Sequence, residues 1–423
     1  MQAYRVSASL IDPVTQRKSR QSQISEGLIG IRGTTLRGAL ARAYLDEFGT
    51  PDERFERLFL DERKTRFGSL QPWQQQVSLT ATSCKRAPGF ASEDHSAHGV
   101  VDLLWFRIAE KLNGGPMVGK IAHKSLCCQH QGANGRICGA ALTPFSGGWT
   151  RSSDSPTLTY VKRPSTSVNM HVGIDRGTST AAPAILFALQ SIVPSSNSQE
   201  TWNGVIHATE ESWSDLRVLL DAIDNRVRIG HAKTRGYGRI ELQVADEEVA
   251  AKATGEAEWD FWSVTAHQFL NTCGLSDNEQ SSAPTTIFSI TFPSGAIIVD
   301  QLLRYSLDPS DMVDWLPILV RPSEKPCWSP IADCPGSNIR SLSAVTRHEM
   351  IRGWQAAHGL PKADEYALVS GAVYAYEYQG QLDWLWNKLD YLRRTGVGLR
   401  RNEGFGDVFI GVPFHQLCKL SLE

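Results

Sequence analysis

The feature that most constrains the fold is a pair of similar glycine-rich segments, GHAKTRGYG at residues 230–238 and GLRRNEGFG at residues 398–406. We call them the first loop and the second loop. Their three glycines coincide at a constant offset of 168 residues, as from Gly230 to Gly398. Each loop follows a sequence with the periodicity of an amphipathic helix and precedes a short sequence typical of a strand. This repetition predicts two halves with related architectures.

The composition of both loops favours contact with a phosphate backbone. Glycine allows positive φ and lets a polyanion approach main-chain N–H groups closely. Residues 226–239 hold five Lys or Arg and no acid, and residues 392–402 hold four and no acid. Clustered cations neutralise phosphates, and an aromatic side chain among them can stack on a base. The candidate RNA contacts of the loops are Arg228, Gly230, His231, Lys233, Arg235, Gly236, Tyr237, Gly238, Arg400, Arg401 and Phe405.

A simpler interpretation of one such loop is a solvated turn, whose cations lie where the dipole of the preceding helix favours them. Two loops in equivalent places favour RNA contact instead. Neither loop is a nucleoside-triphosphate loop or a dinucleotide-binding motif, because the Gly-Lys-Ser/Thr ending and the strand-to-helix context are missing. Glu403 stands where the first loop has Arg235, so the first loop is the better RNA candidate. The second loop is a candidate for contact with a protein partner instead.

Two further basic positions lie at predicted turns. Gly33 and Arg37 stand at the start of a predicted helix over residues 31–48, where main-chain N–H groups can bind phosphate. Arg37 as an ordinary solvated helix residue is an equally good interpretation. Arg176 follows Asp175 in a turn between two apolar strands, where it could contact RNA or form a salt bridge near Asp175.

The order of elements predicts two domains. The first covers residues 1–244 and includes an irregular insertion at about 76–157. Acidic and then polar sequence at 245–284 predicts a linker, because composition shifts and turn formers cluster there. The second domain covers residues 285–423.

The insertion gathers cysteines and histidines. Zinc takes four such ligands in a tetrahedron, and a closed Cys/His set is structural rather than catalytic. The preferred set is Cys84, His98, Cys128 and Cys138, with His130 as the alternative imidazole. The spacing does not follow the usual C-x2-C pairs, so unrelated buried thiols are an equally good interpretation.

The composition sets broad limits. The chain has 423 residues, 41% hydrophobic and 21% charged, with a net charge of −2, which argues against a wholly basic nucleic-acid coat but allows a local basic groove. Its apolar runs are shorter than a membrane span, and the first residues do not match a signal peptide. Eight cysteines in this length predict reduced thiols and a cytoplasmic protein.

Several motifs resemble the RAMP superfamily, the repeat-associated proteins of CRISPR systems. IRGTTLRGALARAY resembles the family's first helix, HVGIDRGTSTAAPAILFALQSI its central hairpin, and the two loops its signature loops. Other motifs resemble the large two-domain subunit of type III-D effector complexes: SCKRAPGF, HGVVD, the cysteines from Cys127 to Cys138, GWQAAHGLPK and RRNEGFGDV. The likeness spans most of the chain but is patchy over residues 245–350.

The resemblance implies an α+β fold of tandem ferredoxin-like (RRM-like) domains with glycine-rich loops and a Cys/His-bearing insertion in the first domain. It also implies an antiviral defence role: binding of the CRISPR guide RNA (crRNA) by its 5′ repeat-derived handle, at one end of a multisubunit effector complex. RAMP backbone subunits and the large polymerase/cyclase-like subunit would be its neighbours, and it would meet target RNA indirectly.

Two enzymatic alternatives remain open at this point. His231 could act as the general acid or base of a metal-independent endoribonuclease that processes repeat RNA. Asp175 could serve in a backbone-type subunit that cleaves target RNA. We favour a non-catalytic subunit, because neither residue has an evident catalytic partner and the second loop has Leu399 at the position of His231.

Overall fold

The computed structural model describes most of the chain. The exceptions are residues 17–23, 26–28, 92–95, 113–126, 133–134, 152–157, 162, 195–200, 249–284, 300–301, 306–337, 356–357, 381 and 419–423. The predicted linker of residues 245–284 therefore lies outside the described residues, apart from residues 245–248, which end strand β14.

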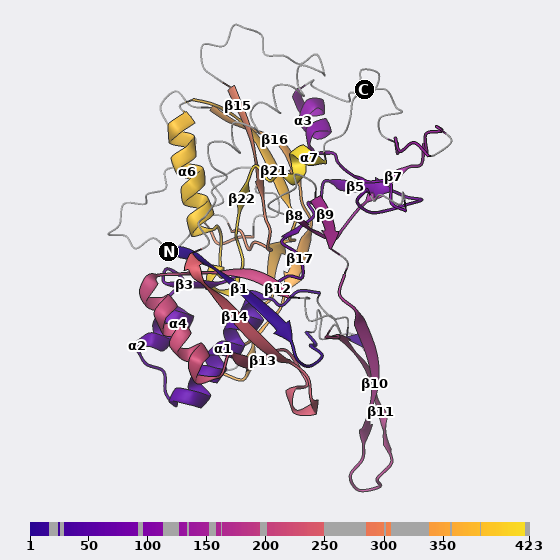
Figure 1. Ribbon diagram of the computed structural model, residues 1–423. Helices are drawn as coiled ribbons and strands as arrows, with labels where there is room; N and C mark the ends of the chain where they lie inside the picture. Colours follow the sequence, from indigo (N-terminus) through magenta and orange to yellow (C-terminus); the bar gives the residue numbers. More distant parts are fainter. Residues whose placement is uncertain are drawn as a thin grey trace.

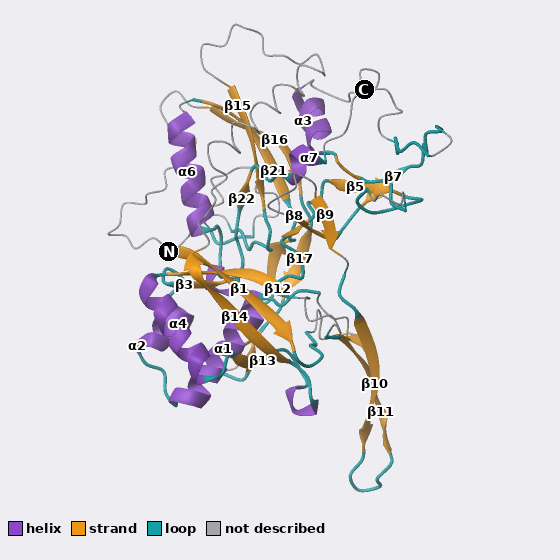
Figure 2. Cartoon of the chain, in the orientation of Figure 1, coloured by secondary structure: helices purple, strands orange, loops and turns teal. Residues whose placement is uncertain are grey.

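A five-stranded antiparallel sheet forms the first half (Figures 1 and 2). Its strands, in spatial order, are β13 (Arg226–Arg228), β14 (Arg239–Glu248), β1 (Gln2–Leu10), β12 (Trp202–Ala208) and β3 (Thr65–Phe67). Helices α1 (Gly33–Phe48) and α4 (Glu210–Ala222) pack on it, together with α2 (Glu53–Phe55) and the π-turn η1 (Glu56–Leu60).

Regular spacing explains why these helices bury one face. Leu36, Leu40 and Tyr44 recur every four residues along α1 and are all buried in the first core. Helix α4 begins at a capping residue, Thr209, whose hydroxyl accepts a hydrogen bond from the Ser212 N–H group.

The second half contains a four-stranded antiparallel sheet. Its strands, in spatial order, are β16 (Asn338–Val345), β21 (Val373–Gln379), β15 (Thr285–Thr291) and β22 (Phe409–Ile410). Helix α6 (Leu382–Thr395) covers one face through Leu385, Leu389 and Leu392, which pack against the tyrosines of β21.

The two sheets share one connectivity. The first half runs β1-α1-β3-β12-α4-β14, and these strands lie in the order β14-β1-β12-β3. The second half runs β15-β16-β21-α6-β22, in the order β22-β15-β21-β16. In both halves the fourth strand along the chain lies beside the first, and the third lies between the first and the second. The chain is therefore a mixed α and β protein with antiparallel sheets, in agreement with the α+β class that the family resemblance implies.

The insertion packs on the second half, although the sequence places it within the first domain. Trp105 and Ile108 of helix α3 (Leu104–Leu112) lie in one buried cluster with Ile287 and Leu342 of the second sheet. The Trp105 indole N–H donates to the His415 carbonyl oxygen over 2.8 Å, near the short helix α7 (Phe414–Leu417). The amphipathic pattern of α3 shows that it is buried but does not tell which sheet covers it.

Small sheets complete the insertion and the second half. In the insertion, β5 (Ala81–Cys84) pairs with β6 (Val100–Asp102) and β7 (Leu142–Pro144), and β8 (Gly148–Arg151) pairs with β4 (Gln75–Gln76) and β9 (Leu158–Val161). In the second half, β17 (His348–Ile351) pairs with β20 (Glu365–Leu368), and β18 (Trp354–Gln355) with β19 (Leu360–Pro361).

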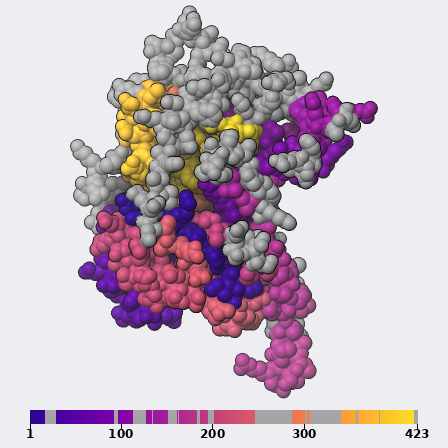
Figure 3. Space-filling model, in the orientation of Figure 1, coloured from indigo at the N-terminus to yellow at the C-terminus, as the bar shows by residue number. Residues whose placement is uncertain are grey.

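A long hairpin projects from the body (Figures 1 and 3). It consists of β10 (Thr166–Ile174) and β11 (Ala181–Ile192), and β11 pairs at its base with β2 (Ile24–Ser25). None of the described helices has both the length and the apolar character needed to cross a membrane.

Candidate RNA interface and metal centre

The two loops have the same backbone. Each contains one 3-10 turn, η3 (Lys233–Arg235) in the first loop and η6 (Arg401–Glu403) in the second. A residue with left-handed φ lies on each side of the turn. These angles are 57° at Ala232 and 84° at Gly236, and 55° at Arg400 and 86° at Gly404. The repeat seen in the sequence is therefore a repeat of conformation.

The second loop lies between the two halves of the molecule. Arg401 is 9% exposed and forms an ion pair with Glu62 across 2.6 Å, while Glu403 is 7% exposed. Glu403 contacts Lys362 and Arg400 of its own half and lies 3.6 Å from Arg37 of the first half. These contacts are made with the chain's own first half, whereas the sequence suggested a separate protein partner for this loop.

The charges of this junction depend on one another. Burial would raise the pKa of Glu403, but Arg400 and Lys362 outweigh it and lower this pKa to about 2. The carboxylate therefore stays ionised among the surrounding cations. Nearby, the buried Arg66 donates hydrogen bonds to the carbonyl oxygens of Arg394 and Thr395 at the end of α6.

The start of α1 belongs to the same junction. A Cβ atom on Gly33 would lie 2.0 Å from the Phe67 carbonyl oxygen, so only glycine fits there. Arg37 donates to the Phe59 carbonyl oxygen, and its side chain is 19% exposed. Arg400 packs over Phe405, which is 6% exposed. Several residues that the sequence predicted to contact RNA therefore contact other residues of this chain instead: Gly33, Arg37, Arg400, Arg401 and Phe405.

The first loop instead faces solvent and the projecting hairpin. The Tyr237 hydroxyl accepts a hydrogen bond from the Asn169 amide of β10 over 3.1 Å. The Arg235 guanidinium lies 5.7 Å from the centre of the Phe187 ring, which stacks on His171 with centres 5.3 Å apart. Loop and hairpin thus form a surface of cations, aromatic rings and amides.

Sequence reasoning missed the hairpin side of this surface. Asn169 and His171 alternate with exposed apolar residues along β10, and Phe187 follows the exposed Leu186 on the partner strand. That period of two was the available signal, because alternate residues share a face. His171 Nε2 is shielded from solvent and has no hydrogen-bond partner among the described residues.

The glycines of the first loop have two different roles. A Cβ atom would lie 2.2 Å from the Thr15 carbonyl oxygen at Gly230 and 2.1 Å from the Ile229 carbonyl oxygen at Gly238. These two positions need glycine because main-chain atoms of the same chain pack directly against them. Gly236 has nothing within 4 Å of that position, so its backbone is open to a ligand.

Cations gather beside the first loop. The Arg228 guanidinium donates to the Lys233 carbonyl oxygen over 2.7 Å. Burial lowers the pKa of Lys233, Arg42 and Arg228 lower it further, and Asp46, which pairs with Arg42, opposes them. Lys233 therefore lies among more cations than acids.

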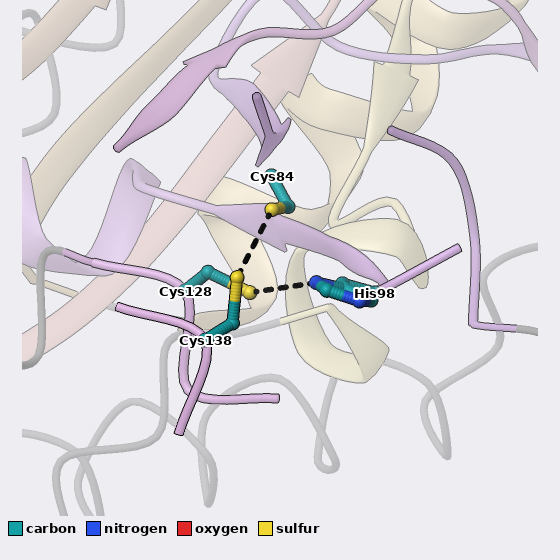
Figure 4. Close-up of side chains that lie close together, drawn as sticks. All are labelled: Cys84, His98, Cys128 and Cys138. Atoms are coloured by element: carbon teal, nitrogen blue, oxygen red, sulfur yellow. Dashed lines mark hydrogen bonds between the residues drawn. The ribbon is translucent and has the colours of Figure 1, made fainter. Parts of the chain in front are cut away.

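The Cys/His cluster of the insertion has the geometry of a metal centre (Figure 4). The Cys84 and Cys138 sulfurs lie 3.8 Å apart, and the Cys128 sulfur lies 3.5 Å from His98 Nδ1. A zinc ion with bonds of about 2.3 Å to sulfur and 2.0 Å to nitrogen sets tetrahedral edges of about 3.8 Å and 3.5 Å. Two of the donor–donor distances match these edges, and all four donor atoms lie within 4.8 Å of one another, so the four residues could hold a metal ion.

His98, rather than His130, belongs to the cluster. The His130 ring stacks on His98 with centres 4.1 Å apart and thus packs behind it. Burial would raise the pKa of Cys84, but the N–H groups of Ala87 and Arg86 help to lower it to about 7. Burial and the neighbouring thiols raise the pKa of Cys128 to about 12. Thiols packed this closely repel when ionised, and a cation between them would remove that cost.

Comparison with protein families identifies the chain. A model of the RAMP superfamily matches residues 19–241, more than half of the sequence. The chain belongs to the RAMP superfamily. The matched region contains α1, the hairpin, the insertion and the first loop of this RAMP protein, and it ends before the second half.

No curated protein matches this RAMP chain. Among solved structures it is similar to a chain of the type III-B Cmr-beta complex bound to cognate target RNA and AMPPnP, with 11% identity and a TM-score of 0.38. That alignment covers 99% of this chain and 98% of the other. Oligomeric Cmr4 from Pyrococcus furiosus is similar at 10% identity and a TM-score of 0.24, covering 58% of this chain and 98% of Cmr4.

The two catalytic candidates of this RAMP protein lie in turns. Asp175 is exposed at the tip of the hairpin, and its carboxylate accepts hydrogen bonds from the Thr178 and Gly177 N–H groups. Those bonds lower the pKa of Asp175 and close the turn. Arg176 is exposed beside it. His231 is exposed in the first loop, where its main-chain N–H group donates to the Thr15 carbonyl oxygen.

Proposed function

We propose that this RAMP protein is a non-catalytic subunit of a type III-D CRISPR effector complex that binds the guide RNA and holds its 5′ repeat-derived handle. Its domains would be tandem ferredoxin-like units, which the shared strand order of the two sheets supports. The resemblance of its motifs to the large type III-D subunit supports the subtype. RAMP backbone subunits and the polymerase/cyclase-like subunit would be its partners in the cytoplasm.

The observation that carries the proposal is the surface between the first loop and the hairpin. Lys233, Arg235 and Arg228 supply cations at a turn whose Gly236 backbone is open. Phe187 and His171 supply stacked rings beside them. Single-stranded RNA is held by this combination, with phosphates on cations and bases on aromatic faces.

The proposed subunit binds without cutting. Asp175 is engaged in its own turn, at the far end of the hairpin from the first loop. General acid–base cleavage of RNA needs a second group within reach of the scissile phosphate. The second loop has Leu399 at the position of His231, so the repeated loops do not share a catalytic imidazole.

The test is expression with the repeat array and neighbouring subunits of its own genome. We expect guide RNA to co-purify, and labelled repeat RNA to be bound but not cut, with or without magnesium. Lys233→Ala with Arg235→Ala should lower the slope of log K against log salt by about 2. Arg340→Ala, which removes an exposed arginine paired with Glu377, is the matched control and should keep the slope.

Two outcomes would contradict the proposal. An unchanged salt slope in the double variant would mean that the first loop does not contact phosphate. Specific cleavage that disappears in His231→Ala would make the protein a processing endoribonuclease instead.

We propose that the Cys/His cluster holds a structural zinc ion. All four positions are taken by protein ligands, so the metal would tie β5 and the loops of the insertion together rather than activate water. Elemental analysis should find one zinc per chain. Cys138→Ser should lose it, whereas Cys127→Ser, next to the cluster but outside it, should keep it. Equal zinc content in both variants would exclude this ligand set.

A further inference from the structure

The three thiols of the Cys/His cluster differ in their exposure and in their neighbours. Cys84 and Cys128 are buried, whereas Cys138 is partly exposed. The Cys138 sulfur lies 3.8 Å from the Cys84 sulfur, while the Cys128 sulfur lies 3.5 Å from His98 Nδ1 (Figure 4). A thiol that solvent can reach therefore has a buried thiol as its direct neighbour.

Main-chain hydrogen bonds hold these two thiols close without the help of a metal. Cys84 ends strand β5, where it pairs with Leu142 of β7, shortly after Cys138 in the sequence. The Lys85 main-chain N–H group donates to the Ala141 carbonyl oxygen over 3.0 Å. A disulfide has a sulfur–sulfur distance of about 2.0 Å, so its formation here needs a shift of two side chains rather than of the strands.

Zinc bound at such a pair is open to one oxidation reaction. Thiolates that solvent reaches are the ones that peroxides oxidise. Hydrogen peroxide takes two electrons from the Cys84 and Cys138 thiolates. Their two bonds to the metal break and one sulfur–sulfur bond forms, while the peroxide O–O bond is cleaved and takes up two protons from solvent to give two waters. Cys128 and His98 then remain as two of the four ligands that zinc takes.

We propose that the Cys/His cluster is a redox switch, in which a peroxide exchanges the zinc ion for a disulfide between Cys84 and Cys138. The inference rests on the proposed zinc centre. The disulfide keeps β5 joined to the loop that carries Cys138, as the metal did before. The exchange releases the His98 imidazole, so the segment before β6 loses its bond to the cluster.

The packing of the insertion on the second half does not depend on the metal. Ala81 of β5 lies in one buried cluster with Val412 and Phe414, and helix α3 packs on the second sheet. The switch therefore changes the metal content and the loops around the cluster, and it leaves the fold in place.

The experiment oxidises the zinc-loaded full-length chain. Hydrogen peroxide is added in steps, released zinc is measured with a chromogenic chelator, and disulfide-linked peptides are identified by mass spectrometry after the free thiols are blocked. We expect one zinc released for each Cys84–Cys138 disulfide, and reduction in the presence of zinc should restore the metal. Cys127→Ser is the matched control and should release zinc in the same ratio, because Cys127 lies outside the cluster.

A second variant separates the disulfide from the metal. Cys128→Ser removes one ligand but neither partner of the bridge, so it should lack zinc and still form the Cys84–Cys138 disulfide. Zinc that stays bound under peroxide, or leaves with a disulfide at Cys127 or Cys128 instead, would overturn the switch and leave the proposed zinc centre standing. A chain that binds no zinc would overturn both.

Discussion

The first and second loops share a backbone but have opposite surroundings. Arg235 of the first loop is exposed and lies over an aromatic ring of the hairpin. Glu403, its equivalent in the second loop, is 7% exposed among three cations. A glycine-rich turn therefore fixes a conformation and leaves its use to the side chains between the glycines. In this chain one copy faces outward for a ligand, and the other joins the two halves.

The largest expected effect concerns these two equivalent residues. Glu403→Ala should lower the free energy of unfolding by about 3–5 kcal/mol, because it removes the anion shared by three largely shielded cations and leaves Arg400 with Glu365 alone. Arg235→Ala should change it by less than about 0.5 kcal/mol, as exposed substitutions usually do. Denaturant unfolding of both variants measures the difference. Similar losses would mean that the loops do not differ in their structural roles.

The second effect is a dependence on pH that only the second loop confers. The pKa of Glu403 is about 2 in the folded protein against an ordinary 4.5, so the unfolded chain binds the proton more readily. Its stabilisation is complete above about pH 4.5 and is lost as the pH falls toward 2, amounting to about 3 kcal/mol. Glu403→Gln should flatten the unfolding free energy over that window. Lys233→Ala with Arg235→Ala removes no acid and should keep the wild-type profile; a flattened profile there would contradict this assignment.

The smallest effect compares two glycines. Gly236 and Gly404 have φ of 84° and 86°, so alanine at either position costs about 1–2 kcal/mol of backbone strain. At Gly404 the added Cβ would also lie 2.6 Å from the Phe67 carbonyl oxygen, whereas nothing lies within 4 Å at Gly236. Gly404→Ala should therefore be about 2 kcal/mol more destabilising, measured by thermal unfolding. Equal losses would show that the junction yields to the extra atom.

Much of the fold could be predicted from the sequence, because the patterns that indicate helices and turns are local. The spacing of glycines predicted equivalent loops, and the four-residue recurrence of Leu36 and Leu40 predicted α1. Contacts between residues far apart in the sequence could not be predicted from it. The apolar pattern of α3 is visible in the sequence, yet that pattern alone could not show that the helix covers the second sheet.

The candidate RNA interface could be predicted only in part, for the same reason. Charge clustering marked Lys233 and Arg235, but the hairpin residues that meet them lie about 50 to 70 positions earlier in the chain. Glu403 was a local sign that the second loop differs, but it could not identify which surface the loop contacts. The cysteine cluster is the exception: despite its irregular spacing, Cys84, His98, Cys128 and Cys138 were preferred from the sequence, and these four side chains lie together in the fold.

Helix α3 also sets the order in which the chain can reach its final form. Its apolar face is synthesised long before the strands that cover it, such as β16 and β21. Asp102, just ahead of it, pairs with the buried His415, which is synthesised 313 residues later. The first half can assemble early around its own core, but the insertion must wait until the strands of the second half have been made. A fragment ending after the first sheet would carry an uncovered apolar helix, so aggregation is the expected fate of truncated products.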